Sequence, residues 1–202
     1  MKTPTVSLRF RLVRAVRRLL RIDRERRWNR EYKSGNWERL RQLDELAHHA
    51  VLAGYVRRLK PRGAVLDVGC GEGLFHEMLG ADGYAQYLGI DFAEPVRLAS
   101  VRANANTRFE VFDMNDFVTA EKFDAIVFDE SIYYSRDVLA ALRRYSSMLN
   151  TGGLLLISMH RTPKTIAVWS SLDAEFEVID AVVITNAHDV SWTVKALVPA
   201  PA

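Results

Sequence analysis

The stretch from Val65 to Gly73, which reads Val-Leu-Asp-Val-Gly-Cys-Gly-Glu-Gly, constrains the fold of this 202-residue chain more than any other segment. Its apolar start is typical of a buried strand, it then breaks into alternating glycines, and residues 74–79 have the pattern of a helix. A strand that turns sharply into a helix over glycines lets a ligand lie directly against the backbone. The segment therefore predicts an α/β fold with a ligand held at this strand–helix turn.

The spacing of the glycines argues against a phosphate ligand. Phosphate-binding turns usually read G-x-G-x-x-G, or end in Lys-Ser/Thr. Here the third glycine comes one residue early, no lysine follows, and Asp67 precedes the turn. An acid at that position repels pyrophosphate but suits a ligand that carries an ammonium group and a sulfonium. The block resembles motif I of the class I, Rossmann-like methyltransferases that depend on S-adenosylmethionine (SAM). That resemblance assigns five residues to the cofactor, namely Asp67, Gly69, Cys70, Gly71 and Gly73.

Acids also close the next two predicted strands. Residues 87–91 end in Asp91, about 20 residues past the turn, where a doubly wound fold places the carboxylate that accepts the ribose hydroxyls. Residues 109–114 form a third strand, and the resemblance implies that Asp113 bonds the adenine amino group while Met114 packs on the ring. It also assigns Phe92 and Asp129 to the cofactor. An acid at a strand end often only caps a helix, and for Asp113 that alternative stays open.

The rest of the chain predicts further strands and a helix. Strands are expected at 123–129 and 152–159, a helix at 165–172, and two further strands at 176–185 and 190–198, joined by a short turn that suits an antiparallel hairpin. The resemblance implies a three-layer α/β fold with a seven-stranded, mostly parallel sheet and a C-terminal antiparallel hairpin. That hairpin separates the family from nicotinamide dehydrogenases. We expect a methyltransferase domain over residues 36–202.

Residues 1–35 form a basic arm. Residues 1–41 hold 14 Lys and Arg against 4 Asp and Glu, a local charge of +10, so the remainder of a chain with net charge +3 carries −7. Residues 8–22 have the pattern of a basic amphipathic helix, which suits an anionic membrane surface. A solvated helix packed on its own domain or on a partner is the alternative. Nucleic acid is disfavoured because the arm lacks interleaved aromatics and the remaining domain is acidic.

The N-terminal pattern predicts no signal peptide, because arginines interrupt every candidate apolar core, and no uncharged apolar run of the sequence is long enough to span a bilayer. We therefore expect a cytoplasmic protein, and binding of the arm to an anionic membrane would place it at the inner membrane face. The oligomeric state is not predicted. After the arm, an aromatic-glycine-Trp segment over 28–40 resembles the opening of small methyltransferases. Trp37 would then cover the cofactor or line the substrate pocket, or it would only anchor the arm. A helix is expected over 43–59.

Chemistry is expected where the fourth strand ends, in Asp129-Glu130-Ser131-Ile132-Tyr133-Tyr134. The block resembles that of nodulation N-methyltransferases and their relatives. Glu130 is the candidate base or amine anchor, Tyr133 and Tyr134 would position the acceptor, and His160 is the second candidate base. A structural alternative is that Glu130 caps a helix and Tyr134 is core. The remaining histidines, at 48, 49, 76 and 188, are interpreted as ordinary helix or loop residues, and the single cysteine gives no metal site.

These features predict an enzyme that transfers a methyl group from SAM to a nitrogen or oxygen atom of a small molecule, a saccharide or a natural product, with S-adenosylhomocysteine as the product. Two rival functions remain open. One is a SAM-binding protein without catalysis, acting as a partner or regulator. The other is a nicotinamide enzyme, which the glycine spacing and the terminal hairpin oppose.

Overall fold

The structure is a computed structural model that describes residues 26–31, 34–35, 37–91 and 95–199. The chain divides into two units, Met1–Trp37 and Glu38–Ala202. In the first unit residues 26–31 are helical, and an ion pair of 3.0 Å joins Arg27 Nε to Glu31 Oε1. The rings of Trp28 and Trp37 lie 5.3 Å apart. The helix expected over 8–22 lies outside the described residues.

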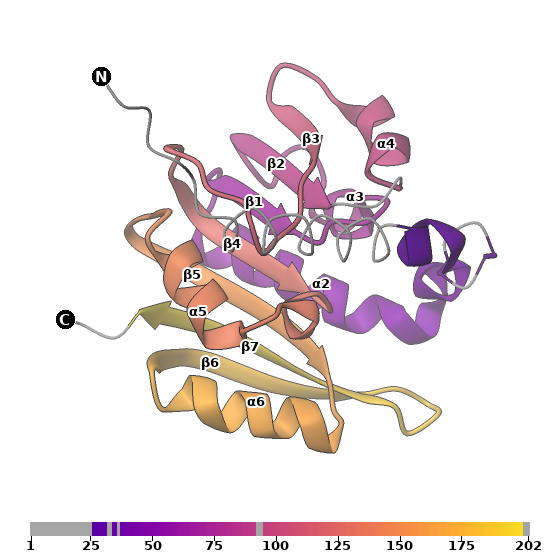
Figure 1. Ribbon diagram of the computed structural model, residues 1–202, viewed down its shortest axis with the longest axis vertical. Helices are drawn as coiled ribbons and strands as arrows, with labels where there is room; N and C mark the ends of the chain where they lie inside the picture. The colour runs from indigo at the N-terminus through magenta and orange to yellow at the C-terminus, as the bar shows by residue number, and fades with distance from the viewer. Residues whose placement is uncertain (1–25, 32–33, 36, 92–94, 200–202) are drawn as a thin grey trace, which may run out of the picture. The chain divides into compact units, whose positions relative to one another are not determined.

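The second unit contains one seven-stranded sheet with the order β3-β2-β1-β4-β5-β7-β6 (Figure 1). The strands are β1 (Ala64–Val68), β2 (Gln86–Asp91), β3 (Thr107–Val111), β4 (Phe123–Asp129), β5 (Leu149–His160), β6 (Phe176–Thr185) and β7 (Ser191–Pro199). Strands β1 to β5 pair in parallel, whereas β7 pairs antiparallel with both β5 and β6. The predicted fold class, including the closing hairpin, is confirmed.

Helices cover both faces of this sheet and produce the three layers. One face packs against α2 (Leu43–Leu59) and α3 (Leu74–Leu79), and the other packs against α5 (Val138–Ser146) and α6 (Pro163–Asp173). The short α4 (Pro95–Ala99) lies beside β2 and β3. Three 3-10 turns complete the described elements: η1 (Glu38–Arg41), η2 (Ser100–Arg102) and η3 (Ile132–Tyr134).

Alternation along β1 shows why the sheet needs both layers. Val65 joins the core under α2 and α3, whereas Leu66 and Val68 join the core under α5 and α6. Successive residues of a strand point to opposite faces, so a run that is apolar at nearly every position fits a strand buried on both sides. The same parity places Asp67 on the α2 side, at the end where all parallel strands finish.

Strand β3 begins and ends earlier in the chain than the sequence predicts. It ends at Val111, so Asp113 and Met114 lie beyond the strand rather than at its end. The physical reason is the partner: β3 pairs only with β2, whose last residue, Asp91, stands opposite Val111. Among the helices of the described chain, none has the length and apolar character needed to cross a bilayer.

Candidate active site

The turn between β1 and α3 exposes backbone in a conformation that few side chains tolerate. Gly69, Gly71 and Gly73 have φ of +80°, +50° and +82°. A Cβ atom at Gly69 would collide with the Cβ of Ser131, which follows β4. Ser131 Oγ also donates to Val68 O at 2.5 Å. The end of β1 is therefore held against the end of β4, with room for backbone alone at the turn.

Two acids frame this turn. Asp91, the last residue of β2, accepts a hydrogen bond from Gly71 N at 3.1 Å. Asp67 is fully buried, and its Oδ2 accepts from the hydroxyl of Tyr87 at 2.5 Å. Its Oδ1 is also buried and has no hydrogen-bond partner among the described residues. Burial, aided by the negative charges of Asp129 and Asp91, raises the pKa of Asp67 to about 8.

The other predicted cofactor residues vary in their surroundings. Cys70 is buried, and burial raises the pKa of its thiol. Asp113 is 2% exposed, and its Oδ1 accepts from the backbone and side-chain nitrogens of Asn115 at 2.9 and 2.7 Å. Met114 is buried in the core under α5. Phe92 lies outside the described residues, so its predicted role is untested.

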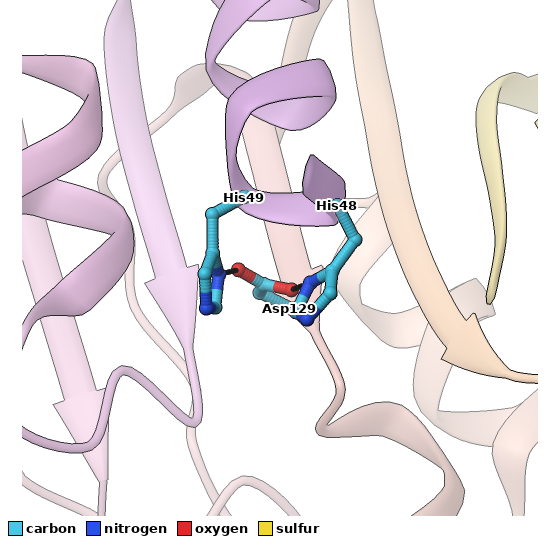
Figure 2. Close-up of side chains that lie close together, drawn as sticks. All are labelled: His48, His49 and Asp129. Atoms are coloured by element: carbon cyan, nitrogen blue, oxygen red, sulfur yellow. Dashed lines mark hydrogen bonds and ion pairs between the residues drawn. The ribbon is translucent and has the colours of Figure 1, made fainter. Parts of the chain in front are cut away.

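Asp129, the last residue of β4, is held by two histidines that sequence reasoning missed. His48 Nδ1 lies 2.9 Å from Oδ1, and His49 Nδ1 makes a short hydrogen bond to Oδ2. Figure 2 shows both imidazoles descending from one turn of α2, one on each side of the carboxylate. The interpretation of these two histidines as ordinary helix residues was wrong. Hereafter the three side chains are called the His-Asp-His cluster.

Charge explains the stability of this cluster. Burial opposes the charge on Asp129, but the positive charges of His49 and His48 and their hydrogen bonds hold the pKa of this carboxyl well below its usual range. Burial likewise opposes the charge on His48, yet the negative charge of Asp129 and the hydrogen bonds that His48 donates to Asp129 and Glu45 raise its pKa to about 10. Glu45 Oε2 lies 3.4 Å from His48 Nε2. The cluster is thus a buried, ionised carboxylate that accepts hydrogen bonds from two imidazoles.

The same three side chains are the candidate metal ligands of the described chain. Their ligand atoms lie within 4.8 Å of one another. Two imidazoles and one carboxylate suit several transition metals. Each imidazole contacts a different oxygen of the carboxylate, as in two ordinary hydrogen bonds. Hydrogen bonds therefore explain the geometry without a metal ion. The prediction of no metal stays a prediction.

Periodicity offered a signal for these histidines. The buried residues of α2 are His48, His49, Leu52, Ala53 and Val56, which form one stripe of the helix. A histidine within an apolar stripe must find a polar partner, because burying an unpaired imidazole nitrogen is costly. That partner, Asp129, lies 81 residues after His48 and 80 after His49, so a local sequence pattern does not identify it.

Glu130 follows Asp129 and lies at the centre of a second network. Its Oε1 accepts from Ser158 Oγ at 2.8 Å, and its Oε2 accepts from Tyr133 OH and from His160 N, each at 3.0 Å. Glu130 has φ of +53°, which is unusual for a residue with a side chain. Burial raises its pKa, and the charge of His48 with the hydrogen bond from Ser158 offsets this only in part. The structure therefore brings together the three predicted catalytic residues.

The aromatic residues beside this network differ in their exposure to solvent. Tyr133 packs against the core, whereas Tyr134 is 42% exposed, with its ring 4.5 Å from that of Tyr133. The alternative that Tyr134 is a core residue is therefore wrong. Trp192 of β7 is buried between two histidines, stacked on His48 at 5.1 Å and 5.8 Å from His160. His48 and His160 thus border one region at the β5–β7 side of Asp129.

The remaining histidines have structural surroundings. His76 Nε2 lies 2.8 Å from the hydroxyl of Tyr84 in the core. His188 is exposed in the hairpin turn, 3.2 Å from Asp44. Trp37 lies in the first unit, which is described by itself, so its predicted place over the cofactor or the substrate stays a prediction.

A mostly parallel sheet with a glycine turn after β1, an acid after β2 and an antiparallel hairpin at the end defines the class I, Rossmann-like methyltransferases. Residues 36–193 match the family described as "Methyltransferase domain". This chain therefore belongs to that family.

Relatives and similar structures agree with this assignment. The chain is 37% identical over 119 residues to the ubiquinone biosynthesis O-methyltransferase of Xanthomonas axonopodis pv. citri, covering 55% of this chain and 49% of that protein. It is 35% identical over 115 residues to the protein of the same name from Xanthomonas campestris pv. campestris, covering 54% and 48%. The chain thus spans about half the length of the curated relatives it matches.

Two solved structures show the same fold. The N-methyltransferase NodS from Bradyrhizobium japonicum WM9, in complex with S-adenosylhomocysteine, has a TM-score of 0.70 at 22% identity, covering 82% of this chain and 92% of that chain. The 1,6-didemethyltoxoflavin-N1-methyltransferase of Burkholderia thailandensis has a TM-score of 0.73 at 14% identity, covering 100% and 94%. At these identities the likeness concerns the fold.

Proposed function

We propose that this chain transfers a methyl group from SAM to a nitrogen or oxygen atom of a small molecule, a sugar or a natural product, and releases S-adenosylhomocysteine. The observation that carries the proposal is the convergence of Asp67, Asp91 and the glycine turn at one edge of the sheet. The unpaired buried Oδ1 of Asp67 suits the ammonium group of that cofactor, and the bare backbone at Gly69 suits close approach of its chain. When bound, SAM supplies a methyl group on a positively charged sulfur.

The roles of the cofactor residues follow from their positions. Asp67 would accept from the ammonium group, and Asp91 would accept from the ribose hydroxyls while it still orients Gly71 N. Asp113 and Met114 are assigned to the adenine by the family resemblance. Asp129 closes the same edge, with its carboxylate held by His48 and His49.

The acceptor would bind beside Glu130. Methyl transfer depends mainly on alignment and on exclusion of water, so a rigid site serves it well. The carboxylate of Glu130 is fixed by three donors, and its raised pKa suits a group that anchors an amine or takes a proton from a hydroxyl. Tyr133 and His160 hold that carboxylate, and the exposed Tyr134 would contact the acceptor.

The proposal is tested in two steps. A melting experiment should show stabilisation by S-adenosylhomocysteine but not by NAD, because only the former presents an ammonium group to Asp67. Stabilisation by NAD alone would support the nicotinamide enzyme. Incubation with labelled methyl donor and fractionated cell extract should then label a small molecule. The substitution Glu130→Gln should abolish labelling while cofactor binding is kept. His160→Gln keeps the backbone N–H that bonds Glu130, so a loss of labelling in this variant would assign the base to the imidazole of His160.

The alternative, a SAM-binding partner or regulator without catalysis, makes the opposite prediction. Cofactor binding would persist, no extract fraction would accept label, and Glu130→Gln would have no effect on any transfer. The raised pKa of Glu130 favours the enzyme, because a purely regulatory site has no need of a buried carboxylate that holds a proton readily.

The basic arm and the compartment are separate predictions. Residues 1–25 lie outside the described residues, so contact with an anionic membrane rests on the sequence pattern. Flotation of the intact protein and of a variant lacking residues 1–25 with anionic liposomes tests it. Equal partitioning of the two proteins would contradict membrane binding by the arm. The proposed location would then be the cytoplasm, without association with the inner membrane face.

A further inference from the structure

Arg102, the last residue of η2, contacts the glycine turn between β1 and α3. Its Nη1 donates to the backbone oxygen of Glu72 at 2.9 Å, and its Nη2 forms an ion pair with Glu77 Oε1. It also lies close to the next residue of the turn, because a Cβ atom added at Gly73 would be 3.5 Å from Arg102 Nη1. Arg102 therefore joins the turn to a segment 30 residues further along the chain.

A second arginine contacts the same turn. Arg41 of η1 donates from Nη2 to Glu72 Oε2 at 2.8 Å, and its Nη1 lies 3.5 Å from Glu77 Oε2. Glu72 is thus held through its carboxylate by Arg41 and through its backbone oxygen by Arg102. Glu77 pairs with both arginines, one at each carboxylate oxygen. The four residues form a closed ring that joins η1, the turn, α3 and η2.

Other contacts of the turn come from β2. Gly69 N and Cys70 N donate to Ile90 O at 2.8 and 3.1 Å, and Gly71 N donates to Asp91 Oδ2 at 3.1 Å. These bonds fix the first half of the turn against the neighbouring strand. The ring of arginines and glutamates fixes its second half.

A turn that contains three glycines needs such contacts. Gly69, Gly71 and Gly73 all have positive φ, and glycine loses more conformational freedom on ordering than any other residue. If the turn became ordered only when a ligand bound, that loss would lower the affinity for the ligand. A hydrogen bond from a charged guanidinium is stronger than one between neutral groups, so Arg102 is suited to order the turn in the free protein.

We propose that Arg102 is a positioning residue for the methyl donor, because it holds the Glu72 carbonyl and so orders the glycine turn before the donor binds. The inference rests on the proposed use of SAM at this turn. Arg102 acts through the backbone of the turn and does not need to touch the donor. Loss of this arginine should therefore leave the fold intact and weaken the binding of S-adenosylhomocysteine.

The chain offers a matched control at the other end of α3. Arg57 Nη2 donates to the backbone oxygen of Leu79 at 2.5 Å and pairs with Asp82 Oδ1 at 2.7 Å. Arg57 thus binds one carbonyl and one carboxylate, as Arg102 does, but at the end of α3 away from the turn. The substitutions Arg57→Ala and Arg102→Ala remove the same kinds of contact.

The first measurement is the affinity for S-adenosylhomocysteine by calorimetry, in variants with an unchanged circular dichroism spectrum. Arg102→Ala should bind about fivefold to tenfold more weakly than the wild type, because the hydrogen bond that orders the turn is lost. Arg57→Ala should change the dissociation constant by less than about twofold, because its contacts are remote from the turn. Glu77→Gln removes the ion pair of Arg102 but keeps an oxygen acceptor for it. This variant should also stay within about twofold, because the contact with the Glu72 carbonyl is kept.

Hydrogen exchange separates ordering of the turn from a general loss of stability. In free Arg102→Ala the amides of residues 69–74 should exchange faster than in the wild type, and S-adenosylhomocysteine should reduce the difference. In Arg57→Ala the same amides should exchange at the wild-type rate. Arg102→Lys keeps one charged donor but not the planar pair of nitrogens, so its affinity should lie between those of the wild type and Arg102→Ala.

Three results would overturn the inference. In the first, Arg102→Ala binds S-adenosylhomocysteine as tightly as the wild type. In the second, Arg57→Ala weakens binding as much as Arg102→Ala, or exchange in Arg102→Ala rises throughout the chain, which would make the effect one of general stability. In the third, the folded wild-type protein does not bind S-adenosylhomocysteine. That last result defeats the proposed function and the inference with it, whereas the first two leave the proposed function intact.

Discussion

The β1–β2 edge and the β4–β5 edge of the sheet carry acids in similar numbers but partner them differently. At the first edge, Asp67 has one oxygen paired with Tyr87 and one with no partner among the described residues. At the second, Glu130 accepts from three donors and Asp129 from two imidazoles. The first edge keeps an unpaired acceptor, which the proposed function assigns to a ligand, whereas the acids of the second edge are paired within the protein.

This difference teaches how the two halves of the site can be specialised. An unpaired buried oxygen lowers the stability of the free protein. A ligand that donates a hydrogen bond to Asp67 would remove this cost, and its binding would be stronger for that reason. A carboxylate saturated by its own fold, such as Glu130, offers a fixed position instead. Substitutions at the first edge should therefore change cofactor affinity, and those at the second should change stability or transfer.

The largest expected effect concerns the turn at which the two edges meet. Gly69→Ala introduces a Cβ at φ of +80° and directs it into Ser131. We expect a loss of about 3 kcal/mol in the free energy of unfolding, from left-handed strain plus overpacking. The control is Gly152→Ala, which has φ of +72° but no atom within 4 Å of the added Cβ. It should lose only about 1 kcal/mol, and equal losses in urea denaturation would refute the close approach of the two edges.

Next in size is the effect of removing the acid after β2. Asp91→Ala leaves the ribose hydroxyls unpaired and should weaken S-adenosylhomocysteine by about 2 kcal/mol, or roughly thirtyfold. Calorimetry measures this directly. Asp82→Ala, which removes an exposed acid paired with Arg57, should leave the dissociation constant unchanged. A normal affinity in Asp91→Ala would show that the cofactor lies elsewhere.

The pH dependence of cofactor binding sharpens the comparison further. The pKa of Asp67 is raised to about 8, so this carboxyl is protonated in the free protein below that pH. An ammonium group binds the ionised form, so binding releases a proton and affinity rises with pH up to about 8, by at most about tenfold per unit. Asp67→Asn cannot release that proton. Its affinity should be lower and should not rise with pH over the same range.

The smallest expected effect lies at the β4–β5 edge. Tyr133→Phe removes one of the three donors to Glu130 and should cost about 1 kcal/mol of unfolding free energy. Tyr55→Phe, which loses an exposed hydrogen bond to Asp180, should cost less. Neither change should alter the affinity for S-adenosylhomocysteine. A weakened affinity in Tyr133→Phe would mean that the two edges are not independent.

Much of the cofactor side could be predicted from sequence because its signals are local. The strand, the turn and the helix that form it occupy one continuous segment, and Asp91 follows at a regular spacing. The hairpin was equally readable, since β6 and β7 are adjacent in the chain and their turn is short. The bounds of β3 were missed because they depend on its pairing with β2.

The acceptor side was only partly predictable. Glu130, Tyr133 and His160 could be named, because they follow strands that end at the same edge. Their hydrogen bonds, and the positive φ of Glu130, depend on how β4 and β5 align. His48 and His49 could not be linked to Asp129, because no local pattern connects a helix turn with a strand end about 80 residues away.

By itself, the sequence determined the family, the succession of strands along the chain and the acids proposed to bind the cofactor, because periodicity and glycine spacing are properties of neighbouring residues. Only the tertiary structure decided which of these acids keep an unpaired oxygen and which are saturated. That distinction depends on contacts between residues distant in the chain, such as the closure of α2 over β4. A buried carboxylate acquires its charge, its pKa and its availability from those contacts.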